Sequence, residues 1–246
     1  MSTTPPAVLV HGAFADSSSW HGVVERLHRD GIPVVANAVP LRSLSGDAAY
    51  LRDVIAGIEG PVLVVAHSYG GMVATEAASQ APNVVGLVYV GAFAPETGES
   101  AFDLAGRFPG STLGETLAST PLSNGQTDLT IRPERFHEQF VADVAPGHAT
   151  CMSASQRPVT QEALTEPLAT TEPAWRRVPS WFVHGGEDRN IPPAALRFMA
   201  ERAGSRGTTE VEGASHAVAV SRPDEVARIV TAAALELELG DAVIAR

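Results

Sequence analysis

Short apolar runs alternate with helical patterns at both ends of this chain, and this alternation constrains the fold more than any other feature. The runs at Val62–Ala66 and Val84–Val90 contain no charged side chain, as expected of parallel strands that are covered on both faces. Between the runs, apolar residues recur at three- and four-residue spacing, which is the period of an amphipathic helix. We therefore predict an α/β protein whose mostly parallel sheet is connected by right-handed helical crossovers.

The alternation assigns six strands and the helices between them. The predicted strands are Ala7–Val10, Ile32–Ala36, Val62–Ala66, Val84–Val90, Ser180–His184 and Thr208–Val211. One helix is predicted to begin after Ser17–Ser19. The other helices predicted between and after these strands are Asp47–Ile58, Gly70–Gln80, Pro193–Ala203 and Pro223–Leu237. Together they predict one six-stranded sheet flanked by helices, in a single domain over residues 1–246.

The alternation is interrupted between Pro95 and Arg177, where proline, glycine and serine are frequent. Short helices are predicted at Ala101–Phe108, Pro133–Val141, Pro146–Ser155 and Gln161–Leu168. Apolar side chains such as Phe102 and Leu113 need a surface to pack against, and open α/β folds bind ligands at the carboxyl edge of the sheet. We therefore predict that residues 95–177 form a helical cap, inserted between the fourth and fifth strands.

The composition excludes several classes of protein. The formal net charge is −11 and no basic run is present, so nucleic acid and anionic membrane surfaces are poor partners. No apolar run reaches the roughly 18 residues of a membrane span, and no signal peptide is recognised after Met1. A lone cysteine, Cys151, excludes a disulfide scaffold. We expect a cytoplasmic protein that acts on a small molecule, with the oligomeric state open and a homodimer among the options.

The strongest local motif is Ala66-His67-Ser68-Tyr69-Gly70-Gly71, which follows a predicted strand and opens a predicted helix. That context is typical of a nucleophile elbow, in which a serine is presented at the edge of the sheet. The small residues Ala66 and Gly70 let strand and helix approach closely. A serine here could also simply cap the helix, so the motif alone is a hypothesis.

Three further loops follow predicted strands. His11-Gly12-Ala13-Phe14 could supply a main-chain amide, from Ala13 or alternatively Phe14, which together with that of Tyr69 would bind an oxyanion. Asp188, in the segment Gly185–Pro192, could orient a histidine, with its neighbour Glu187 as the alternative acid. His216 ends the last of these loops. The order Ser68, Asp188, His216 is the order of the triad in one hydrolase fold.

These segments resemble the α/β-hydrolase superfamily, and more narrowly its small bacterial esterase-like members related to plant methylesterases and hydroxynitrile lyases. The matching segments are Val8–Phe14, Ala66–Gly71, Gly185–Pro192 and Gly213–His216, and the resemblance covers nearly the whole chain. Ala66 is a departure, because the family usually has glycine there. The resemblance implies hydrolysis of an ester, lactone or thioester of a small, mostly apolar substrate through an acyl-enzyme on Ser68, without cofactor or metal.

Other activities on the same fold stay open at this point. Hydroxynitrile lyase activity is disfavoured, because the related plant enzymes require a lysine near the leaving cyanide and all 17 Lys and Arg side chains of this chain are arginine. Perhydrolysis would use the same triad with a different nucleophile. A ligand-binding member would keep the triad but turn over slowly or not at all.

The sequence also offers candidate metal ligands, one cysteine and several candidate pocket residues. His11, His67 and His184 follow strands and could in principle ligate zinc, but hydrogen bonds within their own loops are favoured. Cys151 is expected to be a small buried or half-buried residue rather than a nucleophile. Phe14, Trp20, Phe136 and Phe140 are candidates for the substrate pocket, although core packing is at least as common for such side chains.

Overall fold

The computed structural model describes residues 4–244, and its centre is a six-stranded sheet in which all neighbouring strands are parallel. The strand order is β2-β1-β3-β4-β8-β9. The strands are β1 (Ala7–Val10), β2 (Val34–Asn37), β3 (Val62–His67), β4 (Val84–Val90), β8 (Ser180–Gly185) and β9 (Gly207–Val211). The predicted α/β fold with a six-stranded sheet is confirmed, and each strand lies close to its expected position.

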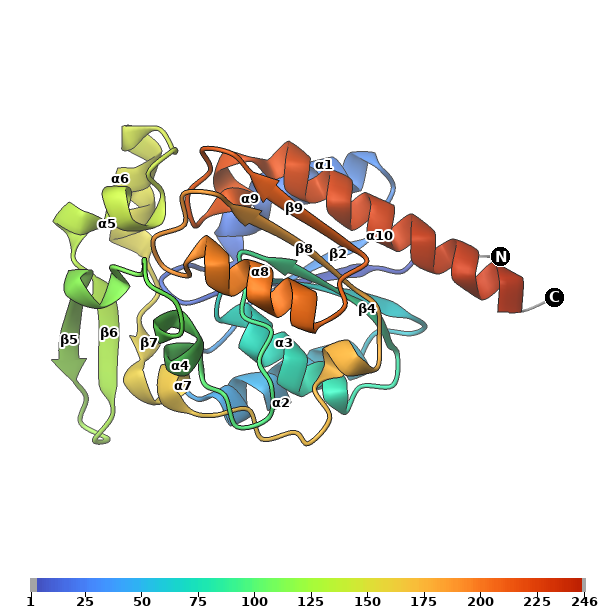
Figure 1. Cartoon of the computed structure of the whole chain (residues 1–246), viewed down its shortest axis with the longest axis horizontal. Coiled ribbons are helices and arrows are strands. Elements are labelled where there is room, and N and C mark those ends of the chain that lie inside the picture. Colours follow the sequence, from blue (N-terminus) through green and yellow to red (C-terminus); the bar gives the residue numbers. More distant parts are fainter. Residues whose placement is uncertain (1–3, 245–246) are drawn as a thin grey trace.

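Alternate side chains of the central strands enter two separate apolar cores, which explains why these strands lack charged residues. In β3, Val62 and Val64 enter one core, whereas Leu63 and Val65 enter the other. The helices covering the first core are α2 (Leu44–Ala56), α3 (Gly70–Ser79) and α8 (Pro193–Arg202). Those covering the second are α1 (His21–Arg29), α9 (Val218–Ser221) and α10 (Pro223–Ile244). Figure 1 shows the sheet between these helices.

Side-chain hydrogen bonds at its first turn explain why helix α2 begins earlier than predicted. Helix α2 begins at Leu44, three residues before the predicted start, because Ser43 accepts a hydrogen bond from the amide of Gly46. The carboxylate of Glu166 also accepts from the first amides of this helix, where negative charge is favourable. No helix within residues 4–244 has the length and apolar character needed to cross a lipid bilayer.

Residues 95–177, the segment predicted to be a cap, combine the predicted short helices with a small sheet that was not predicted. The helices are α4 (Ala101–Gly106), α5 (Pro133–Phe140), α6 (Pro146–Ser155) and α7 (Gln161–Thr165). The antiparallel strands are β5 (Leu117–Pro121), β6 (Thr127–Ile131) and β7 (Val159–Thr160). The prediction of a purely helical cap is therefore incomplete. Strands β5 and β6 are joined through Asn124 and Gly125, which has φ +87°, and asparagine followed by glycine is a strong hairpin signal.

Polar contacts tie the cap to the sheet domain at several points. The guanidinium of Arg42 pairs with Asp128 at 2.6 Å. On another side, Arg202 of α8 pairs with Glu99 at 2.8 Å. Glu76 of α3 accepts hydrogen bonds from two cap amides, those of Ala169 and Thr170. The cap elements gather at one end of the molecule, away from the far end of α10 (Figure 1).

Candidate active site

Ser68, His216 and Asp188 form one hydrogen-bonded chain at the carboxyl edge of the sheet. The Oγ atom of Ser68 is 2.9 Å from Nε2 of His216, and Nδ1 of His216 is 2.7 Å from Oδ2 of Asp188. The carboxylate can only accept, so Nδ1 of the imidazole donates to it. In the neutral imidazole, Nε2 then carries no proton and can accept the hydroxyl proton of Ser68.

The sheet topology explains why residues so far apart in sequence meet. Ser68 follows β3, Asp188 lies in the loop after β8, and His216 lies in the loop after β9. Because these strands are parallel, their carboxyl ends share one edge. The alternative acid, Glu187, is exposed, whereas Asp188 is buried and contacts the histidine. Oδ1 of Asp188 also accepts from the amides of Asn190 and Ile191, at 2.8 and 2.9 Å.

Ser68 lies in a tight turn that needs small neighbours. Its φ is +53°, a left-handed conformation that costs a non-glycine residue about 1–3 kcal/mol and is found at functional sites. A Cβ atom on Gly12 would lie 2.6 Å from Cβ of Ser68, and one on Gly70 would lie 2.6 Å from the carbonyl oxygen of Val10. Both contacts are shorter than any side chain allows, so these glycines are required for the turn to pack against β1.

The histidine of the chain is shielded from solvent by aromatic rings. His216 has no exposed surface. The ring of Phe140 packs edge-on against it with 5.1 Å between centroids. Ser68 retains 7% exposure and lines the cavity described below. Exclusion of water from the far side of the imidazole strengthens its hydrogen bonds.

His67 has a role that the sequence analysis did not anticipate. Its Nε2 donates to the main-chain carbonyl oxygen of His216 at 3.1 Å. Burial, together with the neighbouring His216, lowers the pKa of His67 to about 3, so the ring is neutral near pH 7. His67 therefore stabilises the loop that carries His216. The sequence feature that could have suggested this role is the position of His67 next to Ser68.

The other two histidines weighed as zinc ligands also hydrogen-bond main-chain atoms. His11 donates from Nδ1 to the carbonyl of Gly12 and accepts at Nε2 from the amide of Val39, both at 2.9 Å. His184 donates from Nδ1 to the carbonyl of Gly185 at 3.3 Å. Burial lowers the pKa of both rings. Across residues 4–244, no group of three or more histidine, cysteine, aspartate or glutamate side chains could hold a metal ion.

Cys151 differs from its expected environment. It lies on α6 and is exposed, so the expectation of a buried or half-buried residue is wrong. The reason is that the apolar residues of α6 do not gather on one face, and only Ala149 of its ten residues is buried.

A cavity of about 560 Å³ opens beside Ser68, between the sheet edge and the cap. Its size is within the usual range for small-molecule sites. The sheet domain contributes Ala13, Phe14, Tyr69, Phe93, Asn190 and Ile191. The cap contributes mainly apolar side chains, namely Ala101, Phe102, Ala105, Leu113, Leu117, Leu129 and Leu164. The sequence analysis named Phe102 and Leu113 only as apolar residues that need a packing surface. Leu113 is half-buried at this cavity, whereas Phe102 lines it but remains 71% exposed.

The amides of Ala13 and Tyr69, the candidate oxyanion donors, belong to residues that line this cavity. Within residues 4–244, neither amide donates a hydrogen bond to another group of the protein. The phenol of Tyr69 points elsewhere, since it donates to Oδ2 of Asp47 at 3.0 Å. Phe14, the alternative to Ala13, has φ +61°.

Three of the four aromatic pocket candidates do not line the cavity, which corrects their expected placement. Phe14 does line it. Trp20 is buried in the core on the other side of the sheet, edge-on to His67. Phe136 and Phe140 pack against each other with 5.2 Å between centroids, and Phe140 lies against His216. The aromatic side chains of α5 therefore pack toward His216 and not into the cavity, and helical periodicity alone could not distinguish these two arrangements.

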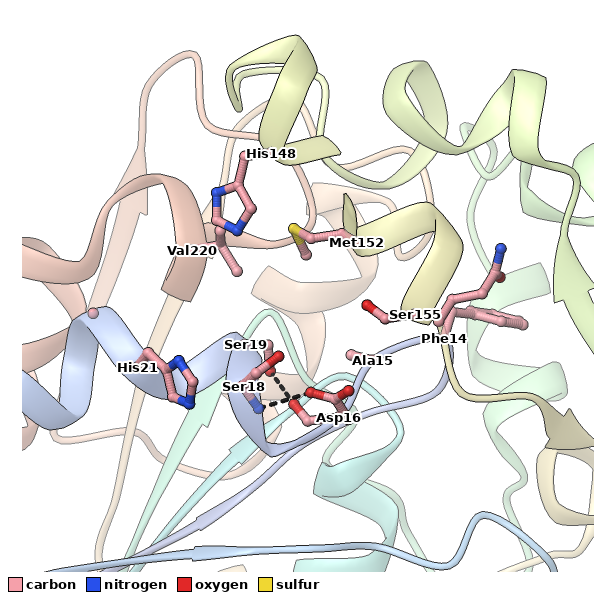
Figure 2. A pocket seen from close by; sticks show the side chains of 12 residues that line it. Phe14, Ala15, Asp16, Ser18, Ser19, His21, His148, Met152, Ser155 and Val220 are labelled. Carbon is pink, nitrogen blue, oxygen red and sulfur yellow. Dashed lines mark hydrogen bonds between the residues drawn. The ribbon is translucent and has the colours of Figure 1, made fainter. Parts of the chain in front are cut away.

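A second, smaller cavity of about 240 Å³ lies between the start of α1 and helix α6 of the cap. Figure 2 shows Ser18, Ser19 and His21 on one side, with His148 and Met152 of the cap facing them. Phe14 lines both cavities, and none of the three triad residues lines this one.

Known proteins resemble this chain in sequence and fold. A model of the alpha/beta hydrolase family matches residues 7–229. A carbendazim hydrolyzing esterase from Nocardioides sp. (strain SG-4G) is 38% identical over 110 residues, which are 39% of this chain and 46% of that protein. Methylesterase 9 of Arabidopsis thaliana is 24% identical over 240 residues, covering 89% of this chain and 94% of that protein. The crystal structure of polyneuridine aldehyde esterase has a TM-score of 0.78 at 19% identity, covering 92% of this chain and 98% of the other.

Proposed function

Because this chain belongs to the alpha/beta hydrolase family, we propose that it is a serine esterase that acts through Ser68, His216 and Asp188. The observation that carries the proposal is the continuous hydrogen-bonded chain from Ser68 Oγ to the carboxylate of Asp188. The named esterases among its relatives support the same reaction class.

In the proposed first half-reaction, Ser68 Oγ attacks the carbonyl carbon of the ester while Nε2 of His216 takes the hydroxyl proton. The imidazolium is stabilised by Asp188. The tetrahedral intermediate collapses as His216 returns that proton to the leaving alcohol, and the acyl group stays on Ser68. Water then attacks the acyl-enzyme with His216 again as the base, which releases the acid and restores Ser68.

The amides of Ala13 and Tyr69 are proposed to bind the oxyanion of both intermediates. Two features support this assignment: both residues line the cavity at Ser68, and both amides are uncommitted within the described part of the chain. Donors held in place before the charge develops need no reorganisation, which is the main source of their effect.

The cavity favours a small ester, thioester or lactone with an apolar body. Its walls are mostly aliphatic and aromatic, and its volume of about 560 Å³ is large enough for a branched or aromatic group. The cap supplies most of the lining, so the cap is proposed to select the substrate.

The test combines turnover with active-site labelling. p-Nitrophenyl acetate, butyrate and octanoate are assayed with the wild type and with Ser68→Ala, for which kcat should fall by roughly 10⁴–10⁶. A fluorophosphonate should add once, at Ser68, as read by intact mass and peptide mapping. Cys151→Ser is the matched control, because Cys151 is exposed on α6, and it should retain both labelling and turnover.

Two outcomes would contradict the proposal. Full activity in Ser68→Ala, or labelling at Cys151 in place of Ser68, would show that another nucleophile acts. Stoichiometric labelling of Ser68 without steady-state turnover of any ester, thioester or lactone would instead favour a ligand-binding protein.

A further inference from the structure

Asn190 is a buried polar residue of the cavity that the proposed mechanism does not use. It is 2% exposed and lines the cavity at Ser68. Its main chain is held at both ends, since its amide donates to Asp188 and its carbonyl accepts from Ser111 Oγ at 2.9 Å. The main chain at Asn190 is therefore held in place beside Asp188.

The orientation of the Asn190 amide follows from its neighbour Gln139 on α5. Nε2 of Gln139 lies 2.9 Å from the carbonyl oxygen of Arg189, which can only accept, so this atom must be the donor end. Oε1 of Gln139 accepts from Thr112 Oγ1 at 2.9 Å. The same Nε2 donates to Oδ1 of Asn190 at 2.7 Å. The network thus commits Oδ1 of Asn190 to the protein and turns Nδ2 away from Gln139.

No group within residues 4–244 accepts a hydrogen bond from Nδ2 of Asn190. The other polar side chains of the cavity are engaged or exposed: Ser111 and Thr165 donate their hydroxyls to main-chain carbonyls, and Gln161 is exposed. Among the residues that line this mainly apolar cavity, Asn190 is accordingly the buried one whose side-chain donor, Nδ2, has no acceptor in the described part of the chain.

We propose that Nδ2 of Asn190 binds a second hydrogen-bond acceptor on the substrate, so that the preferred esters carry a ketone, ether or second ester oxygen besides the scissile carbonyl. A buried donor that loses its water on substrate entry must be given an acceptor by the substrate, or binding is weakened. Sites built in this way discriminate strongly against analogues that lack the partner group. The inference rests on the proposed esterase function and deepens it by naming a substrate class.

The experiment compares matched esters on wild type and Asn190→Leu. Methyl 3-, 4- and 5-oxohexanoate are set against methyl hexanoate, and 2-methoxyethyl hexanoate against butyl hexanoate, which places the acceptor on either side of the ester. In the wild type, kcat/KM should favour at least one acceptor-bearing ester. In Asn190→Leu the ratio of kcat/KM between the acceptor-bearing ester and its plain partner should fall by roughly 10- to 100-fold.

Two further variants make the result decisive. Asn190→Asp keeps an acceptor for Gln139 and removes the donor, so it serves if the leucine variant is unstable, and it should lose the same preference. Thr112→Val removes a hydrogen bond at the exposed end of the network, outside the cavity, and should keep the preference.

The outcomes separate this inference from the esterase proposal. If both members of each pair slow together in Asn190→Leu, or the preference is unchanged, Asn190 only supports the Asp188 loop and the inference fails. If wild-type protein hydrolyses none of the esters and Ser68 resists the fluorophosphonate, the esterase proposal itself fails.

Discussion

The ring of His67 donates a hydrogen bond to the main-chain carbonyl of His216, 3.1 Å from Nε2 to oxygen. The residue next to Ser68 in sequence thereby holds the loop that carries His216. The two rings also lie close, with 4.8 Å between centroids. A charge on His67 would face both burial and a neighbouring imidazole, which is why its pKa is lowered to about 3.

The low pKa of His67 predicts loss of stability in mild acid. In the unfolded chain this histidine takes up a proton near its ordinary pKa of 6.5, whereas burial in the folded protein lowers that pKa to about 3. The stabilisation is therefore complete above pH 6.5 and declines as the pH falls toward 3, by about 1.4 kcal/mol per pH unit for one such group. His67→Gln can still donate to the carbonyl but does not titrate, so its loss of stability between pH 7 and pH 4 should be smaller.

Urea unfolding at four pH values between 7.5 and 4 measures this difference. His28→Gln is the matched control, because His28 is exposed on α1, and its stability should follow the wild-type pH dependence. His11 and His184 also have lowered pKa values, so part of the slope should remain in His67→Gln. Identical slopes in wild type and His67→Gln would contradict the assigned burial effect.

Asp188→Asn should lower kcat by roughly 10⁴, through the tautomer of His216. Oδ1 of Asp188 is held by the amides of Asn190 and Ile191, so an asparagine there would turn its NH₂ group toward Nδ1 of His216. The imidazole would then carry its proton on Nε2 and could not accept from Ser68.

Glu187→Gln is the control for this change, since Glu187 is exposed beside the buried acid. Its kcat with a p-nitrophenyl ester should be near that of the wild type. The reverse pattern, an active Asp188→Asn and an inactive Glu187→Gln, would show that Glu187 and not Asp188 is the required carboxylate.

Gly12→Ala should disrupt the turn at Ser68. The new Cβ would lie 2.6 Å from Cβ of Ser68 and 2.8 Å from the carbonyl oxygen of His67, so the backbone must shift. We expect at least a 10²-fold loss of kcat/KM and a lower Tm. Gly147→Ala on α6 meets nothing within 4 Å and should leave activity unchanged and stability equal or slightly higher. Equal activities of the two variants would show that the contact at Gly12 is not limiting.

Phe140→Ala and Leu164→Ala should have different effects on catalysis. Phe140 is 1% exposed and packs behind His216, so its loss should cost about 3–5 kcal/mol of unfolding free energy and slow every ester in parallel. Leu164 of α7 lines the cavity, so its truncation should alter the octanoate-to-acetate ratio of kcat/KM by up to about 1–3 kcal/mol. A changed ratio in Phe140→Ala with an unchanged ratio in Leu164→Ala would reverse the two assignments.

Local sequence patterns were enough to predict the sheet, the order of the strands along the chain and the candidate triad. The apolar runs at Val62–Ala66 and Val84–Val90 and the helical periodicity between them are local patterns, set by which faces of each element are buried. The nucleophile motif at Ser68 and the loops with Asp188 and His216 each follow a strand. Since parallel strands share a carboxyl edge, their proximity could be predicted without coordinates.

Which side chains face the cavity could not be predicted from such patterns, because it depends on packing between segments far apart in the chain. Phe136 and Phe140 have the same periodicity as pocket residues would, yet Phe140 packs against His216 and Phe136 packs against Phe140. The hydrogen bonds of His67 to His216 and of Gln139 to Asn190 span 149 and 51 positions, and no local pattern encodes them. The sequence specifies the chemistry available at the sheet edge, and the packing of the cap on that edge selects the groups that a substrate can reach.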